Sequence, residues 1–223
     1  HVPEGHWREP LSILLRDLEE HAALSPLGRV IACGQMVGQL RARIRAERLL
    51  QAHPEIAARR IERPVIVVGP MRSGTTRIQR LLACDPRFAH TRMFEGMDPV
   101  PFRARRLDRR RPVAAAVCAF MRRADADIRR IHPTAPLQPD EEIGLHSFSF
   151  HGPQYEAQWH VPNFTRYCED ADTGSAYREF ATLLKIMAWN RRDRQDKIQL
   201  LKSPQFTADL PALLQVFPDA RLI

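Results

Sequence analysis

Cysteine is scarce in this sequence, and the spacing of the few cysteines argues against a metal-held or disulfide-held fold. The 223 residues contain four of them, Cys33, Cys84, Cys118 and Cys168, with no C-x-x-C pair and no histidine at metal-ligand spacing. A structural zinc site needs ligands in such closely spaced pairs. We therefore expect free thiols in a reducing cytoplasm and no metal site.

Long hydrophobic runs are also missing. The longest apolar stretches, such as Ala114 to Met121, fall far short of the roughly 20 residues that a membrane-spanning helix needs. No signal peptide is recognisable, so we expect no membrane span and a cytoplasmic location. The chain begins at His1 rather than at methionine and ends at Ile223 within an expected strand, which predicts a piece truncated at its C-terminus.

Lysine is rare, although the chain is strongly basic. The net charge is +8, and all but three of the 34 basic residues are arginine. A positive charge favours anionic partners: nucleotide phosphates, sulfate donors, nucleic acid or acidic lipids. Composition does not choose among them, and an arginine bias also arises from a GC-rich genome. The rarity of lysine draws attention to Lys185, Lys197 and Lys202.

The sequence is organised around the stretch from Arg63 to Cys84. Four β-branched residues, Val65 to Val68, form an unbroken apolar run, which is typical of a strand buried on both faces of a parallel sheet. Gly69 and Pro70 end the strand, and residues 73–76 open a helix. This strand, loop and helix N-terminus predict an anion cradle, because the first turn of a helix presents unpaired N–H groups and the positive end of the dipole.

The loop departs from the Walker A pattern G-x-x-x-x-G-K-[ST] at one position. Gly69 and Gly74 have the right spacing and Thr76 supplies the hydroxyl, but Thr75 stands where the pattern has lysine. A P-loop kinase or NTPase uses that lysine on the β- and γ-phosphates, so its absence counts against ATP or GTP chemistry. The loop does hold a cation, Arg72. It therefore suits a phosphate ester with a different terminal group, with a merely structural turn as the alternative.

The remaining patterns predict an α/β fold with a P-loop-type parallel sheet flanked by helices. Helical stripes at residues 8–22 and 27–52 make a helical N-terminal extension over residues 1–62. In the α/β domain, residues 63–223, a short strand begins at Phe88 and places Glu95 at its carboxyl end. A second buried strand ends at Lys202. Helices are expected at about 112–130 and 176–192, and a last strand over 220–223. Strands that alternate with helices imply βαβ units.

Three motifs, in this order, make the sequence resemble a known family. Residues 70–76, P-M-R-S-G-T-T, resemble the 5′-phosphosulfate loop of sulfotransferases that use 3′-phosphoadenosine 5′-phosphosulfate (PAPS), in the form found in the bacterial branch and in tyrosylprotein sulfotransferases. K-S-P at 202–204 and F-P-D-A-R at 217–221 are similar to the motifs that follow in the bacterial enzymes. The resemblance covers residues 63–223. It implies a sulfotransferase with PAPS as co-substrate and no metal, whose 3′-phosphate-binding residues lie beyond Ile223.

Chemistry and resemblance together suggest roles for individual residues. Sulfonate transfer builds negative charge on the leaving phosphate oxygen, which fixed cations and hydrogen-bond donors stabilise. We expect Arg72 and Lys202 to flank that oxygen and Glu95 to take the acceptor's proton, with His146 as the reserve base. The alternative to this catalytic role is that Glu95 is an ordinary charged residue on the surface. The loop residues expected to hold the 5′-phosphate are Ser73, Gly74, Thr75 and Thr76.

The acceptor side is less defined. The resemblance makes four residues candidates for the acceptor pocket: His146, Phe148, Phe150 and Trp159. For His146, the alternative is a residue of the hydrophobic core. Glu141 and Glu142 are expected to cap the helix that follows them. Carbohydrate, lipid, phenol, other small molecules and peptides all fit as acceptors, and the oligomeric state is open.

Two other functions remain open as alternatives to the sulfotransferase. One is a P-loop nucleotide or small-molecule kinase, which the missing lysine opposes. The other is a non-catalytic nucleic-acid-binding domain, which only the basic charge supports. Because no recognisable nucleic-acid motif accompanies that charge, we expect no nucleic-acid partner.

Overall fold

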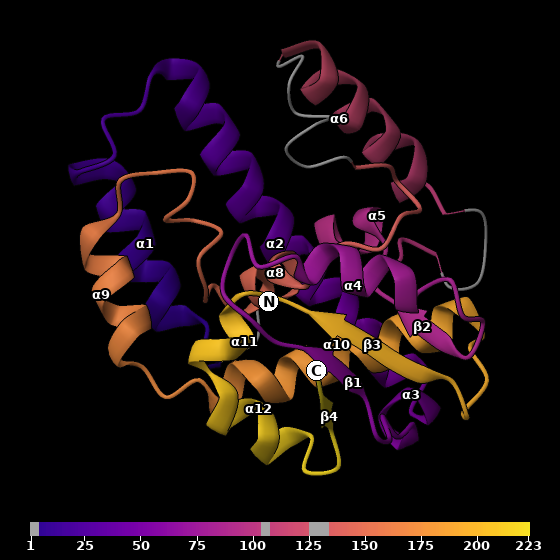
Figure 1. Cartoon of the computed structure of the whole chain (residues 1–223). Coiled ribbons are helices and arrows are strands. Elements are labelled where there is room, and N and C mark those ends of the chain that lie inside the picture. The colour runs from indigo at the N-terminus through magenta and orange to yellow at the C-terminus, as the bar shows by residue number, and fades with distance from the viewer. Residues whose placement is uncertain (1–4, 104–107, 125–133) are drawn as a thin grey trace.

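The computed structural model describes residues 5–103, 108–124 and 134–223, and within them it has a parallel sheet flanked by helices (Figure 1). The strands are β1 (Val65–Val67), β2 (Phe88–His90), β3 (Ile198–Lys202) and β4 (Arg221–Leu222). Their order across the sheet is β2–β3–β1–β4, and each neighbouring pair is parallel. The predicted α/β class with a parallel sheet is confirmed.

Strand β1 is buried on both faces, as its unbroken apolar run predicts. Ile66 belongs to the larger hydrophobic core, together with side chains of α10 (Gly174–Arg191) and α12 (Leu210–Val216). Val65 and Val67 belong to a smaller core, against which α4 (Thr75–Leu82) packs. Helices thus cover both faces of the sheet (Figure 1).

The N-terminal helices are α1 (Arg8–Glu20), α2 (Pro26–Ala52) and α3 (Glu55–Ala58), and the first two match the predicted helical stripes. Ser25 caps α2 by accepting a hydrogen bond from the Gly28 N–H at 3.1 Å. Helix α1 packs against α9 (Pro162–Asp170), and α2 contributes Ala42 and Ala46 to the larger core. These helices therefore share cores with the rest of the chain, and the division at residue 62 stays a prediction.

The other elements are α5 (Met93–Met97), α6 (Arg110–Ala124), α8 (Ile143–His146), the 3₁₀ turn η1 (Ser147–Ser149) and α11 (Gln205–Ala208). Helix α6 begins two residues before its predicted start at 112, and residues 125–130 of that prediction lie outside the described part of the chain. Helix α5 was not predicted. Glu95 therefore lies in a helix, not at the end of a strand.

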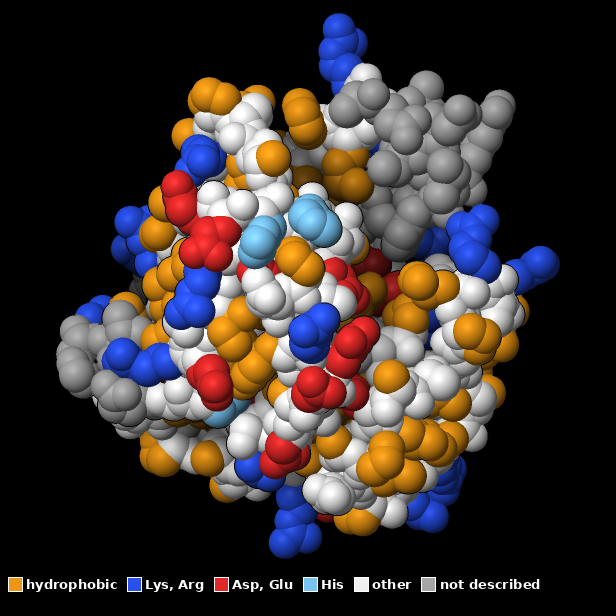
Figure 2. Space-filling view, turned by 90° about the vertical axis from the view of Figure 1, so that its left-hand side faces the viewer, with side chains coloured by type: hydrophobic (Ala, Val, Ile, Leu, Met, Phe, Trp, Pro, Cys, Tyr) orange, Lys and Arg blue, Asp and Glu red, His pale blue; other side chains and the backbone are white. Residues whose placement is uncertain are grey.

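Two surface properties bear on possible partners. No described helix is long and apolar enough to cross a membrane. On the face shown in Figure 2, Lys and Arg side chains are scattered among acidic and hydrophobic ones rather than gathered into one basic patch. That face therefore does not have the continuous basic stripe that usually marks a nucleic-acid interface.

Candidate active site

Strand pairing brings the loop and the lysine of the second motif to one edge of the sheet. Val67, the last residue of β1, pairs with Lys202, the last residue of β3. Because the two strands are parallel, both chains leave the sheet at the same edge, where ligands of α/β folds bind. The Lys202 Nζ atom lies 3.2 Å from Thr76 Oγ1. The expected juxtaposition of Lys202 and the loop is present.

The loop between β1 and α4 is held at both ends. The Gly69 N–H donates to Thr207 Oγ1 at 3.2 Å, and Ser73 Oγ donates to the Pro70 carbonyl at 2.7 Å. Gly74 has a left-handed φ of +88°, a conformation that costs other residues roughly 1–2 kcal/mol. As the N-cap of α4, Gly74 brings no side chain to the first-turn N–H groups, so no cap competes with an anion there.

The Lys202 side chain is buried between the loop and an acidic residue. It is 5% exposed, and besides Thr76 its ammonium contacts Glu141, with which it forms an ion pair. A buried cation needs such a partner, because an unpaired charge is costly to remove from water. An incoming anion therefore binds the Lys202 ammonium only when Glu141 shares this ammonium with the anion or gives up the ion pair.

A pocket of about 850 Å³ opens beside this ion pair and is lined by Lys202 and Glu141. Arg77 and Arg80 of α4 also line it. Ser73 is not among the lining residues, and its hydroxyl bonds within its own loop. The other predicted loop residues do line the pocket: Arg72, Gly74, Thr75 and Thr76. The lining thus combines several cations with a helix N-terminus, which suits a phosphate or sulfate ester.

The acidic segment before α8 has another role than the predicted capping. Glu142 forms no side-chain cap hydrogen bond to α8. Its Oε2 instead accepts the Lys202 N–H at 2.6 Å, and its own N–H donates to the Lys202 carbonyl at 3.3 Å. Gln79 of α4 donates to the Asp140 carbonyl at 3.1 Å. The capping prediction is wrong, because these bonds tie the segment to β3 and α4 and hold Glu141 against Lys202.

Burial sets the charge of Glu142. Desolvation raises its pKa to about 8, against the hydrogen bond from the Lys202 N–H, which lowers it. At neutral pH the Glu142 carboxyl is therefore mostly protonated. Its contribution to stability is full below the usual pKa of 4.5 and is lost as the pH rises through about 8. Glu141 is thus the carboxylate that balances the Lys202 charge.

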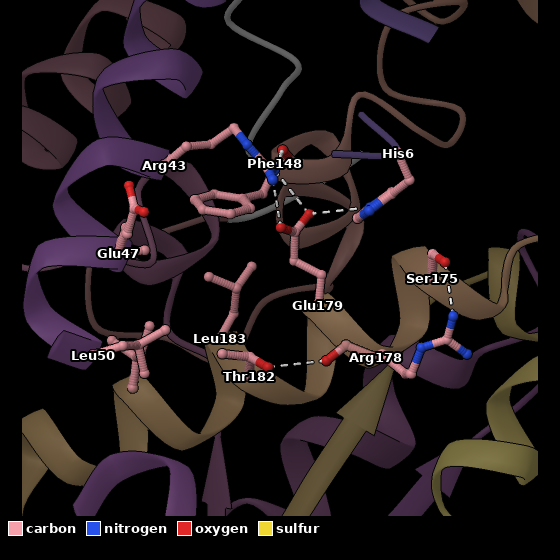
Figure 3. Close-up of a pocket in the computed structure, with 12 residues that line it drawn as sticks. His6, Arg43, Glu47, Leu50, Phe148, Ser175, Arg178, Glu179, Thr182 and Leu183 are labelled. Atoms are coloured by element: carbon pink, nitrogen blue, oxygen red, sulfur yellow. Dashed lines mark hydrogen bonds and ion pairs between the residues drawn. The ribbon is translucent and has the colours of Figure 1, made fainter. Parts of the chain in front are cut away.

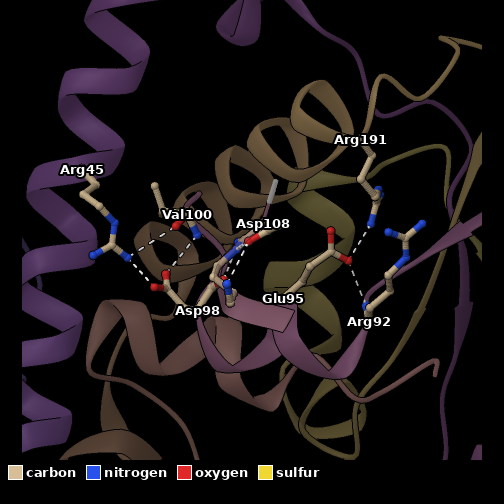
Figure 4. A network of polar contacts seen from close by, with 8 residues as sticks. Arg45, Arg92, Glu95, Asp98, Val100, Asp108 and Arg191 are labelled. Atoms are coloured by element: carbon tan, nitrogen blue, oxygen red, sulfur yellow. Dashed lines mark hydrogen bonds and ion pairs between the residues drawn. The ribbon is translucent and has the colours of Figure 1, made fainter. Parts of the chain in front are cut away.

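Glu95 does not line this pocket. It is completely buried in α5, where its Oε2 accepts hydrogen bonds at 3.1 Å from Arg191 Nη1 and from the Arg92 N–H (Figure 4). Arg191 is also buried and pairs with Asp193 as well. Glu95 was expected to face the acceptor beside the loop, but in the structure its carboxylate points into the interior. Its carboxylate is enclosed in an ion pair that joins α5 to α10.

The aromatic residues expected at the acceptor pocket lie in hydrophobic cores. Phe148 belongs to the larger core and Phe150 to the core beside α1, against which the partly buried Trp159 packs. His146 is 1% exposed and stacks on Phe180 with ring centroids 4.9 Å apart. Burial lowers the pKa of His146 to about 3, so the ring stays neutral. At this position His146 does not reach the Lys202 pocket as a reserve base.

A second pocket of about 430 Å³ lies between α2 and α10 (Figure 3). Phe148 lines it beside Arg43 and Glu179, which are joined by hydrogen bonds of 2.7 and 2.8 Å. His6 lies 3.5 Å from the same carboxylate. None of its lining residues lines the Lys202 pocket. Since its central charges are already paired, this pocket does not extend the anion site.

Sequence reasoning missed three contributors on α4 to this site. Arg77 and Arg80 line the pocket and are three positions apart, a spacing that places both on one face of a helix that begins at the loop. Gln79 is buried, and no local pattern marked it, because Arg77 and Arg80 lie close to it in sequence. The role of Glu141 had no local signal, because Lys202 lies 61 positions away.

These features define a class of protein. A glycine-containing loop, an uncapped helix N-terminus and a lysine from the neighbouring parallel strand form the anion site of an α/β group-transfer protein. Residues 64–223 match the model of the sulfotransferase family, and the chain belongs to that family.

Two solved structures are similar to this chain. Sulfotransferase STF1 from Mycobacterium tuberculosis H37Rv (type1 form) is 28% identical with a TM-score of 0.76, over 97% of this chain and 59% of that one. Sulfotransferase STF9 from Mycobacterium avium is 26% identical with a TM-score of 0.82, over 100% and 57%. The chain therefore spans less than two thirds of the length of these relatives. No curated protein matches it. The likeness to tyrosylprotein sulfotransferases stays a prediction.

Proposed function

We propose that this protein transfers a sulfonate group from PAPS to a hydroxyl or amine acceptor. Membership of the sulfotransferase family supports the reaction class. The absence of lysine at the Walker position supports a donor other than ATP. The observation that carries the proposal is the 3.2 Å contact between Lys202 Nζ and Thr76 Oγ1, in which a buried cation lies beside an uncapped helix N-terminus.

The loop and the start of α4 would hold the donor's 5′-phosphate. In this proposal the N–H groups of residues 73–76 point to the phosphate oxygens, and the hydroxyls of Thr75 and Thr76 add hydrogen bonds. Ser73 takes part through its backbone, because its hydroxyl is bonded to Pro70. Arg72, exposed on the pocket wall, approaches the donor from the solvent side.

The transfer step needs charge stabilisation more than covalent help. The acceptor oxygen or nitrogen attacks sulfur in line, its bond to sulfur forms as the bond to the bridging phosphate oxygen breaks, and negative charge grows on that oxygen. Lys202 and Arg72 stabilise this charge as prearranged cations. No metal takes part in this scheme.

Glu141 replaces Glu95 as the proposed general base. It lines the pocket and touches the Lys202 ammonium, whereas Glu95 is paired with Arg191 in the interior. An anionic donor competes for Lys202 and so frees the Glu141 carboxylate to take the acceptor's proton. Donor binding would in this way make the Glu141 carboxylate available as the general base.

The family assignment favours this function over the kinase and nucleic-acid alternatives. The acceptor classes named above remain candidates, and we place the activity in a bacterial cytoplasm. Transfer of ³⁵S-labelled sulfonate from PAPS, measured over a panel of acceptors, tests the proposal. Lys202→Ala and Arg72→Ala should each lower the rate by roughly 10²–10³.

The control for this assay is Lys185→Ala. Its ammonium donates to the Ala57 carbonyl, away from the pocket lining, and this variant should keep its rate. Transfer of phosphate from ATP in place of sulfonate, or an unimpaired Lys202→Ala enzyme, would show that the proposal is wrong.

A further inference from the structure

Helix α6 carries an apolar stretch between arginines that the proposed function does not use. Residues 112–121 contain no charged side chain, whereas residues 109–111 and 122–123 are all arginine. Arg109 just before the helix and four positions within it, Val113, Ala116, Phe120 and Arg123, follow one another at steps of four, three, four and three. This spacing places them on one face of a helix.

That face is exposed. Only the opposite stripe of α6, with Ala114 and Cys118, is buried against side chains of α5. Phe120 is 73% exposed and Val113 is 58% exposed. Such exposure of neighbouring large apolar side chains often marks an interaction surface. Arg109, Ala116 and Arg123 are exposed as well.

The apolar surface continues beyond the helix. A hollow of about 340 Å³ is lined by Phe102, Arg103, Asp108, Arg109 and Val113. Phe102 is 55% exposed. The carboxylate of Asp108 is engaged by Arg110 at 2.6 Å, so this acid is balanced within the chain. We call the α6 surface the group Phe102, Arg103, Arg109, Val113, Phe120 and Arg123.

We propose that the α6 surface docks onto an anionic lipid bilayer. Its composition matches what such a surface binds, since aromatic and aliphatic side chains insert at the headgroup boundary while arginines meet the negative headgroups. Charge complementarity points to this partner, because the arginines lie at both ends of the apolar stripe. No membrane-spanning segment is involved, and the docking does not depend on the sulfonate-transfer proposal.

Sedimentation with vesicles tests the docking with the whole chain. The protein is spun with vesicles of phosphatidylcholine alone and with vesicles that contain one quarter phosphatidylglycerol. We expect binding to the anionic vesicles that weakens as salt is raised, because salt screens the charges. Arg109→Gln with Arg123→Gln should weaken it about 30-fold, since each charge near an anionic surface contributes about 1 kcal/mol. Phe120→Ser should weaken it at least tenfold.

Matched controls separate the α6 surface from charge and hydrophobicity in general. Arg60→Gln with Arg194→Gln removes the same charge from side chains that are 81% and 80% exposed elsewhere. Leu27→Ser removes an apolar side chain that is 69% exposed on α2. Both controls should bind as the parent does, and all variants should keep the parent's circular dichroism.

Three results would overturn this inference. The first is no binding to anionic vesicles, and the second is an equal loss in the controls. The third is a parent chain that sediments as a dimer without lipid and becomes monomeric in Phe120→Ser, which would identify the α6 surface as a contact with a second copy.

Discussion

Lys202 and Glu141 form the ion pair at the centre of the proposed chemistry, and each accounts for the other's position. The lysine lies at the end of β3 with its side chain buried, and the glutamate supplies the countercharge that burial requires. Glu95 has its own buried partner in Arg191. These two buried pairs differ in place, because only the pair of Lys202 and Glu141 lines the pocket.

The two carboxylates give a matched test of the general base. Glu141→Gln should lower the rate of sulfonate transfer and remove the acidic limb of the pH–rate profile, because the group that accepts the proton is gone. Glu95→Gln should keep that limb, whatever it does to stability. A profile that loses its acidic limb in Glu95→Gln, and keeps it in Glu141→Gln, would return the base to Glu95.

His146 makes the fold sensitive to acid. Its pKa is lowered to about 3 by burial, and neither ring nitrogen has a hydrogen-bond partner among the described residues. As the pH falls below the usual value of 6.5, the unfolded chain binds a proton that the folded chain does not. Between pH 7 and pH 5 this residue should therefore lower the free energy of unfolding by about 2 kcal/mol.

His146→Phe keeps the ring that stacks on Phe180 and removes the titrating group. Urea denaturation of parent and variant at pH 7 and pH 5 measures the difference, and the variant should be less sensitive to acid by that amount. Equal sensitivity of the two proteins would mean that His146 is protonated in the fold.

At the scale of elements, the turn from β1 into α4 contains three residues with positive φ, Gly69, Arg72 and Gly74. Gly74 has a φ of +88°, and a Cβ there would meet no other atom within 4 Å. Gly74→Ala therefore carries a purely conformational cost of roughly 1–2 kcal/mol, and it should weaken donor binding by displacing the first-turn N–H groups.

Gly34→Ala is the control for that prediction. Gly34 lies in the interior of α2, where a Cβ also meets nothing within 4 Å. Because alanine is the better helix former there, this variant should gain roughly 0.5–1 kcal/mol. Thermal melts of both variants measure the two changes in stability, which should have opposite signs. A destabilised Gly34→Ala together with a neutral Gly74→Ala would contradict this prediction.

The elements that sequence predicts well are those with strong periodicity or a strong local signal. The β-branched run of β1, the long stripes of α2 and α10 and the proline–aspartate turn before β4 all carry their pattern within a few residues. Helix α5 has only five residues, too few for a periodic pattern. The predicted place of Glu95 at the end of a strand was wrong for the same reason, and its partner Arg191 lies 96 positions away in sequence.

At the scale of the whole molecule, the sheet order explains how two distant motifs meet. The loop after β1 and the lysine at the end of β3 become neighbours only because the strands pair in parallel with Val67 opposite Lys202. Sequence could predict this meeting from the βαβ pattern. It could not predict the acceptor side, since the aromatic residues chosen for it serve the cores instead.

Calorimetric titration with adenosine 3′,5′-bisphosphate, the product that PAPS leaves behind, asks whether the loop and Lys202 hold a sulfonate donor. We expect the protein to bind it without metal and more tightly than it binds ATP with Mg²⁺. Lys202→Ala should weaken this binding at least tenfold, because a charged hydrogen bond contributes about 1.5–3 kcal/mol. An unchanged affinity in Lys202→Ala, or a preference for ATP with Mg²⁺, would contradict this expectation.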